Sequence, residues 1–570
     1  MRRLPFLTAA LLLAPLGHAQ GITAETPLRP VTRTVALTNA RVVQAPGRVL
    51  ESATVVVRDG LIEAVGRDVA VPYDAEVIEA DTLTVYAGFV DALGHAGVPE
   101  PDDDETEVTD PGDPPRERAG IQPDRDVRTL LRTDHPSVEA LRAAGFTAAH
   151  VVPRGPVLPG QGAVALLRAP LHGERDAAVL LTGPASLYAR FEDASGVYPN
   201  TPMGVVAVLR DLFTEAGRRR GAQARYAEAG GAPRPAFDPV LDALAPSLDG
   251  ERPLYFAAES PTEAFRALRL GDELRVPVVL AGPPWSAPLV EALQARGGPV
   301  LAPLALPDTL AADTSAAAVP YPAATPGGDV FITSRRTRSY ADLEAEGGAL
   351  RAQRAAALGR YEANAATLAA AGVPFAFMTL EAEPTDLQPN LRRMLAAGLS
   401  EDDALAALTT TPARLLGLDR QLGTVEPGKL ANLVVTAGSY FDEEGAVRLV
   451  LVEGVVHEVG EDDLPEGADP DAVVDATGTW RFTASTPGGE QRGTFTLEGT
   501  GSALRGTITT DETRPLSSVT LDGNVLTVRF TQPGMGEIRI TGVIEGDAFT
   551  GSALVAGTES VSVTATRQPD

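Results

Sequence analysis

The chain has 570 residues, a formal net charge of −28 at pH 7 and no cysteine. Such an acidic excess argues against a nucleic-acid partner, because phosphates are bound by Lys and Arg that displace counterions. The absence of cysteine excludes disulfides and thiol catalysis, so stability must come from buried cores, which a chain of this length can build in several domains.

The N-terminus has the order of a secretory signal peptide. Met1-Arg2-Arg3 supplies positive charge, residues 4–16 are apolar, and Gly17-His18-Ala19-Gln20 offers a small-residue cleavage site. The alternative is a membrane anchor, which needs about 20 apolar residues in a row. We therefore expect residues 1–19 to be removed and the protein to be periplasmic or extracellular, with no membrane span.

Residues 20–85 are predicted to form the N-terminal part of a β-sandwich. Apolar strands are expected over residues 35–43, 53–57 and 61–65. Asp59-Gly60 separates the last two, and this dipeptide supplies the positive φ that a tight hairpin needs.

Residues 86–418 alternate between short apolar strands and alanine-rich helical stretches. Strands are expected at 146–150, 253–257, 277–280 and 373–377, and helices at 137–144, 261–275 and 341–371. Alternation over more than 300 residues predicts parallel βα units, most simply a TIM-like (β/α)8 barrel.

Strands return after residue 418. Those at 431–435, 447–452 and 455–456 are expected to complete the first sandwich from residues 419–470, which makes it a composite of both flanks of the barrel. Residues 476–570 are rich in Gly, Thr and Ser and alternate in hydrophobicity, with turn signals about every ten residues. This pattern predicts a C-terminal all-β module.

Two segments at opposite ends of the barrel region resemble the amidohydrolase superfamily, in the imidazolonepropionase-like type with a composite domain. The first runs from Val85 to His95 and resembles the strand-one signature, in which Pro-Gly-Phe-Ile-Asp leads into a His-x-His pair. The second, from Thr410 to Val435, looks like the closing helix and the return to the sandwich. The resemblance covers roughly residues 35–457 and implies the same α/β fold.

The resemblance also implies a metal site at the C-terminal mouth of the barrel, where a metal activates water. Its ligands would be the His-x-His pair, histidines after strands five and six, an Asp after strand eight and, in binuclear members, a carboxylated Lys after strand four. Here Leu93 replaces the first histidine, Ala257 stands near the strand-five position, and Leu380 stands where the Asp is expected. Strand six (278–282) has no histidine, and the single lysine, Lys429, lies outside the barrel. The resemblance therefore predicts a divergent member with a degraded metal site.

Two candidate ligands remain near strand one, Asp91 and His95. With nearby carboxylates they would suit a single divalent ion, Zn or Mn. His135 stands before a proline at a helix start and His172 in a turn, so both are predicted to be loop residues.

A Gly/Pro-rich loop at 153–164 resembles a pocket-lining loop of some superfamily members. Arg154 and Gln161 within it, and His150 at the preceding strand end, are candidate substrate-binding residues, suited to a carboxylate or an amide. A purely structural role for the loop and for His150 is the alternative.

Two functions stay open. The first is a hydrolase of carbon-nitrogen (non-peptide) bonds with a rewired site, in which Glu259 and Glu381 are the candidate catalytic carboxylates. The second is a non-catalytic member, a pseudoenzyme whose barrel serves as a binding or scaffold protein. Convergence of the carboxylates would favour the first, and packing of Leu93 against Leu380 the second. Metal-free hydrolysis by the two glutamates is a weaker third option. A small-molecule ligand is the expected partner, and the resemblance implies a homodimer.

Overall fold

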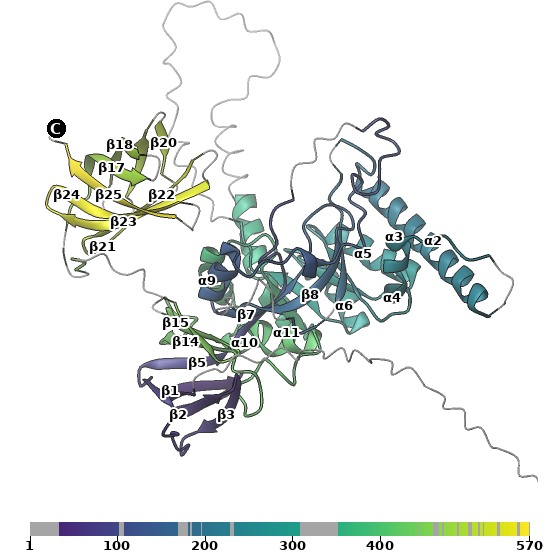
Figure 1. The fold of residues 1–570 in the computed structure, drawn as a ribbon, viewed down its shortest axis with the longest axis horizontal. Coiled ribbons are helices and arrows are strands. Elements are labelled where there is room, and N and C mark those ends of the chain that lie inside the picture. The colour runs from purple at the N-terminus through teal and green to yellow at the C-terminus, as the bar shows by residue number, and fades with distance from the viewer. Residues whose placement is uncertain are drawn as a thin grey trace, which may run out of the picture.

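The computed structural model describes residues 34–568, with gaps at 102–107, 169–179, 183–184, 195, 229–232, 308–351, 444, 460–466, 470–471, 473, 487–488, 500–503, 511–512, 517, 533–535 and 556–558. The predicted signal peptide and His172 lie outside the described residues. Three sheets organise the described part of the chain (Figure 1). No helix within it is long and apolar enough to cross a membrane.

The first sheet joins strands from both sides of the barrel region, in the order β16-β15-β14-β5-β1-β2-β3, with β4 beside β1. Strand β14 pairs antiparallel with β5, so Leu433 lies opposite Ala87 across 346 residues of sequence. The hairpin between β2 and β3 is confirmed, because Asp59 and Gly60 have φ of 52° and 75° and Arg58 pairs with Leu61. The strands are β1 (Val35–Ala45), β2 (Arg48–Arg58), β3 (Leu61–Gly66), β4 (Glu76–Glu79), β5 (Leu83–Ala87), β14 (Leu433–Ala437), β15 (Val447–Val452) and β16 (Val455–Glu458).

The second sheet has eight strands in chain order, and its two ends meet like a barrel. The amides of Thr379 and Leu380, after the last strand, donate to the carbonyl of Leu93 in the first, at 3.1 and 3.2 Å. The strands are β6 (Phe89–Gly94), β7 (Phe146–Val151), β8 (Gly160–Leu166), β9 (Ser186–Arg190), β10 (Leu254–Ala257), β11 (Val278–Ala281), β12 (Val300–Pro303) and β13 (Phe375–Met378).

One strand departs from the all-parallel arrangement of a (β/α)8 barrel. Strand β8 runs antiparallel to both β7 and β9, whereas the other neighbouring pairs within the sheet are parallel. The short connection from β7 to β8, residues 152–159, explains the first pairing, because a parallel crossover needs a dozen or more residues. The Gly/Pro loop is therefore a hairpin connection.

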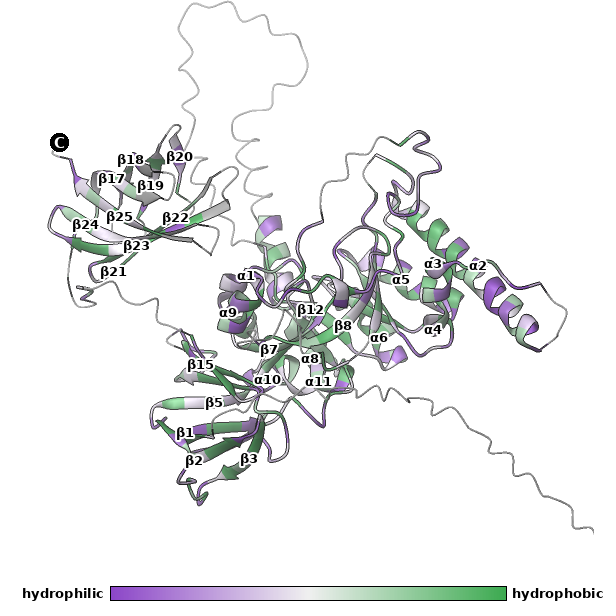
Figure 2. Ribbon diagram, in the orientation of Figure 1, coloured by the Kyte–Doolittle hydropathy of each residue, from purple (hydrophilic) through white to green (hydrophobic). Residues whose placement is uncertain are grey.

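Helices surround the second sheet, and α2 projects from it (Figure 1). Figure 2 shows hydrophobic residues along the strands of the first two sheets, with hydrophilic ones on outer helix faces. His135 caps α1 by accepting from the amide of Ser137, as a helix-start residue does. The helices are α1 (Pro136–Ala143), α2 (Pro202–Glu228), α3 (Pro239–Ala243), α4 (Ala245–Leu248), α5 (Pro261–Leu274), α6 (Val290–Arg296), α8 (Asn364–Ala370), α9 (Leu387–Ala396), α10 (Glu401–Leu408) and α11 (Thr410–Leu415), with 3-10 turns η1 (Val127–Thr129), η2 (Ala287–Leu289) and η4 (Pro384–Asp386).

The third sheet is all antiparallel and has its own core. Its nine strands follow the order β20-β19-β18-β17-β25-β24-β23-β22-β21. Trp480, Phe495 and Phe549 belong to its buried cluster. The strands are β17 (Gly478–Thr486), β18 (Gly489–Glu498), β19 (Arg505–Thr509), β20 (Thr513–Pro515), β21 (Ser518–Asp522), β22 (Val525–Gln532), β23 (Gly536–Glu545), β24 (Ala548–Val555) and β25 (Glu559–Arg567).

Candidate functional site at the barrel mouth

The positions expected to bear metal ligands lie at or just after the carboxyl ends of the strands. Strands β10, β11 and β13 are the fifth, sixth and eighth of the barrel sheet, as the sequence predicts. Leu93 and Leu380 are buried in one apolar cluster, where they pack with Tyr188, Tyr255 and Met378. Both positions therefore carry aliphatic side chains within one apolar cluster.

Asp91 is fully buried and braces β6 against the end of β13. Its Oδ1 accepts from the amides of Leu93 (3.2 Å) and Thr379 (2.9 Å), and its Oδ2 accepts from the hydroxyl of Thr379 (2.6 Å). Burial raises the pKa of Asp91 to about 6, although these three donors oppose the rise. The next glycine fits this arrangement, because a Cβ on Gly94 would stand 2.3 Å from Asp91 Oδ2.

His95 lies almost completely buried at the same mouth. Its Nδ1 donates to the carbonyl of Val152 at 2.8 Å, which leaves Nε2 as the unprotonated nitrogen. Burial lowers the pKa of His95 to about 4, and the positive charges of Arg154, Arg190 and Arg125 act in the same direction. His95 is therefore a neutral imidazole at neutral pH.

His150 is held inside the sheet by two hydrogen bonds. Its Nδ1 donates to the carbonyl of Ala92 (3.0 Å), and its Nε2 accepts from the hydroxyl of Ser186 (2.7 Å). Both side chains are fully buried, and the ring of Tyr255 lies edge-on to the imidazole. Burial lowers the pKa of His150 to about 4. These contacts match the structural alternative for His150.

Glu259 and Glu381 do come together, through a shared arginine. Arg190, at the end of β9, contacts Glu192 through Nε (2.8 Å), Glu259 through Nη2 (3.7 Å) and Glu381 through Nη1 (3.4 Å). Arg190 is 16% exposed, whereas Glu259 and Glu381 are 84% and 65% exposed. Glu381 also has a φ of 60°, a conformation that glycine adopts more readily.

The side chains of Arg154 and Gln161 bind residues of a neighbouring loop. Arg154 pairs with Glu100 at 2.9 Å and donates to the carbonyl of Val98 at 3.2 Å. Gln161 donates from its buried side chain to the carbonyl of Pro123 at 2.8 Å. Both residues therefore fasten the loop that follows β6.

The side chains at the mouth do not fit a divalent metal of the implied kind. Among the described residues, no group of three or more His, Asp or Glu lies close enough to hold an ion. The oxygens of Asp91 are taken by three donors, and the glutamates face a guanidinium. Asp91 and His95 thus have separate roles in the structure.

The sequence did not single out three residues that organise this mouth: Arg190, Thr379 and Ser186. Each binds a residue far away in sequence, as Thr379 does with Asp91 across 288 positions. The sequence offered one sign of Arg190, its position at the end of a short apolar strand. The resemblance implies a carboxylated Lys after strand four in binuclear members, and Arg190 ends the fourth strand of the sheet.

Comparison with known proteins supports the family. Residues 356–457 match the model of the Amidohydrolase family. An amidohydrolase from Thermotoga maritima MSB8 superposes with a TM-score of 0.56 at 24% identity, over 74% of this chain and 99% of that one. An Xaa-Pro dipeptidase with bound methionine has a TM-score of 0.40 at 16% identity, over 75% of this chain and 100% of that one. A molinate hydrolase has a TM-score of 0.41 at 16% identity, over 78% and 98%. Among curated proteins, none matches the chain.

The superposition on the Thermotoga protein shows an amidohydrolase-type α/β fold. The family model covers a separate part of that evidence, residues 356–457, and agrees with the resemblance seen in the sequence.

Proposed function

We propose that this chain is a non-catalytic member of the superfamily, exported from the cytoplasm, whose barrel serves as a binding or scaffold protein. The observation that carries the proposal is the joint burial of Leu93 and Leu380 in the cluster with Tyr188 and Tyr255. Carbon atoms at these positions cannot bind a metal, and a fold alone does not carry a function. Export rests on the signal-like residues 1–19 and is a separate part of the proposal.

The electrostatics of the mouth support the same view. Arg190 places one positive charge among three carboxylates that end or follow β9, β10 and β13. A divalent ion would be the usual partner of such oxygen ligands. The guanidinium of Arg190 thus supplies the positive charge that a bound metal ion would otherwise supply to these carboxylates.

Arg190→Met is expected to lower the free energy of unfolding by about 1 kcal/mol, since the glutamates are largely exposed. It should also leave three uncompensated carboxylates, so Ca²⁺ or Mn²⁺ should raise the melting temperature of the variant but not of the parent. Thermal melting with and without each cation measures both effects. Arg210→Met is the matched control, because Arg210 forms an exposed pair with Glu273 on the helices. An equal cation response in parent and variant would contradict this role of Arg190.

The alternative is a hydrolase of carbon-nitrogen bonds, which the family resemblance implies. One observation favours it: the Nδ1 of His95 is committed to Val152, which leaves its Nε2 as an acceptor near the mouth. Such a nitrogen could accept a proton from water.

A hydrolysis screen separates the two functions. Residues 20–570, supplied with Zn²⁺ or Mn²⁺, are incubated with amide and lactam substrates, alongside His95→Ala and the control His457→Ala outside the barrel mouth. We expect no turnover above buffer in any of the three proteins. Turnover that falls at least about tenfold in His95→Ala alone would establish the hydrolase instead.

A further inference from the structure

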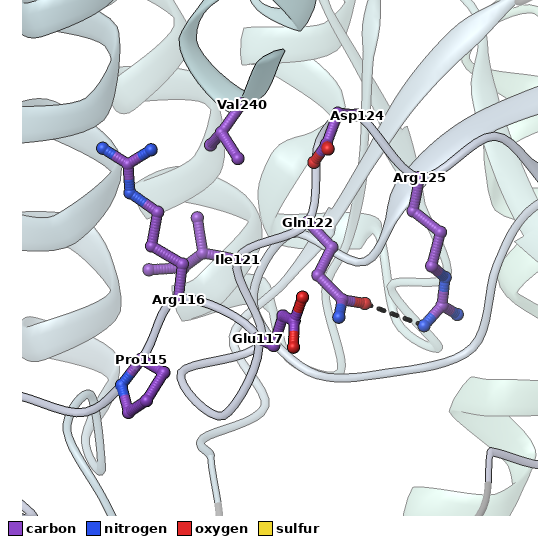
Figure 3. Close-up of a pocket in the computed structure, with 8 residues that line it drawn as sticks. All are labelled: Pro115, Arg116, Glu117, Ile121, Gln122, Asp124, Arg125 and Val240. Atoms are coloured by element: carbon purple, nitrogen blue, oxygen red, sulfur yellow. Dashed lines mark hydrogen bonds between the residues drawn. The ribbon is translucent and has the colours of Figure 1, made fainter. Parts of the chain in front are cut away.

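A cavity of about 650 Å³ lies on the loop that follows β6, next to α3. Its volume is in the range of about 300–1,000 Å³ that small-molecule sites occupy. The lining residues bring both charges and apolar carbon to one space; they are Pro115, Arg116, Glu117, Ile121, Gln122, Asp124, Arg125 and Val240 (Figure 3).

The wall of the cavity is fixed by contacts outside it. Gln161 holds it from behind, since its side chain binds the carbonyl of Pro123 and its amide donates to the carbonyl of Arg125, both at 2.8 Å. Arg116 anchors the other side through Asp238, the N-cap of α3, at 3.0 Å. A wall held in this way loses little freedom when a ligand binds.

Arg125 is a half-buried cation without an anionic partner among the described residues. Its Nη1 donates to the Gln122 side chain (2.9 Å) and its Nη2 to the carbonyl of Arg154 (2.6 Å). Its Nε is buried and has no partner within the described chain. Burial lowers the pKa of Arg125, because a guanidinium with neutral partners is poorly compensated. A carboxylate is the ligand group that such a guanidinium binds best.

The cavity also has negatively charged groups in its lining. Figure 3 shows the carboxylates of Glu117 and Asp124 on either side of Gln122, and all three residues line the cavity. Both acidic residues are exposed. Ile121 is buried, and with Val240 it gives the cavity an apolar surface.

We propose that this cavity binds a small zwitterion with an apolar side chain: its carboxylate on Arg125, its ammonium on Glu117 and Asp124, and its side chain against Ile121 and Val240. A free amino acid and a short peptide with free ends share this chemistry. None of the lining residues is a position at which the resemblance implies a metal ligand, so binding here is tested without a metal at the mouth.

Calorimetric titration of the full chain in EDTA tests the proposal with four probes. L-Leucine and Leu-Leu are zwitterions of two sizes, whereas N-acetyl-leucine lacks the ammonium and leucinamide lacks the carboxylate. We expect one zwitterion per chain to bind, and each blocked probe to bind at least about tenfold more weakly than leucine, as the loss of a charge-assisted hydrogen bond predicts. Tighter binding of leucine would identify a free amino acid as the ligand, and tighter binding of Leu-Leu would identify a short peptide.

Two variants test which residue binds the carboxylate of the ligand and which binds its ammonium. Arg125→Gln should remove the preference for leucine over leucinamide, and Asp124→Asn should weaken the preference for leucine over N-acetyl-leucine, because each change deletes one side of a pair. Asp124 is exposed, so its variant keeps the test valid if Arg125→Gln does not fold. Arg128→Gln is the matched control, since Arg128 pairs with Asp126 outside the cavity. Failure of both zwitterions to bind at millimolar concentration, or binding indifferent to both variants, would overturn the proposal. Neither result would alter the metal content or the hydrolysis screen of the barrel mouth.

Discussion

Asp91→Ala is expected to lower the free energy of unfolding by about 2–4 kcal/mol, because neutral donors of a buried hydrogen-bond network lose their acceptor. The carboxylate of Asp91 accepts from two backbone amides and one hydroxyl. In the variant the amide of Leu93 and the hydroxyl of Thr379 lose this acceptor, whereas the amide of Thr379 keeps its bond to the carbonyl of Leu93. Each unsatisfied donor costs about 1–3 kcal/mol. The loss also weakens the junction between β6 and the end of β13, which then depends on the two amides that donate to the carbonyl of Leu93.

Asp91→Asn is the matched variant, and we expect it to cost about 1 kcal/mol or less. Its amide oxygen can accept from both backbone amides, and its nitrogen can donate to the hydroxyl of Thr379. Scanning calorimetry of the three proteins at pH 7 measures the difference. If Asp91→Ala were as stable as Asp91→Asn, the bracing role of Asp91 would be wrong.

Lowering the pH from 7 to 5 is expected to destabilise the fold by a few kcal/mol. The pKa values of His95 and His150 are lowered to about 4, below the value near 6.5 of an unfolded histidine. Stability from these two residues is therefore complete above pH 6.5 and is lost as the pH falls towards 4, at about 2 kcal/mol each by pH 5. The pKa of Asp91 is raised to about 6, so its contribution runs the other way and recovers about 1 kcal/mol.

Thermal melting across pH 7 to 5 measures this loss. His95→Asn should reduce the slope, because the Asn amide can still donate to the carbonyl of Val152 but does not titrate. A melting temperature that rises steadily from pH 7 to 5 would contradict the assignment of neutral, buried histidines.

The sequence predicted local features and strand positions well. The Asp59-Gly60 hairpin and the strands near 146–150, 253–257 and 373–377 are present, because turn chemistry and apolar runs are encoded by neighbouring residues. The antiparallel direction of β8 was missed. The connection at 152–159 is too short for a parallel crossover and could have indicated this direction. Its Gly/Pro content was interpreted as a pocket loop instead.

The candidate site was predicted only in part. Glu259 and Glu381 lie at one mouth as expected, yet the arginine that joins them was not foreseen, since Arg190 is 69 and 191 residues away. Arg154 and Gln161 are not among the residues that line the cavity next to α3, but they hydrogen-bond the loop that bears it. Pairings across such distances depend on how the barrel closes, which no local pattern encodes.

Elemental analysis tests the central claim most directly. Residues 20–570 are purified without a tag after growth with added Zn and Mn, and are dialysed against metal-free buffer together with His95→Ala. We predict far less than one ion per chain, at the same level in both proteins. About one tightly held ion per chain in the parent, lost in His95→Ala, would contradict a non-catalytic barrel and would establish a rebuilt metal site.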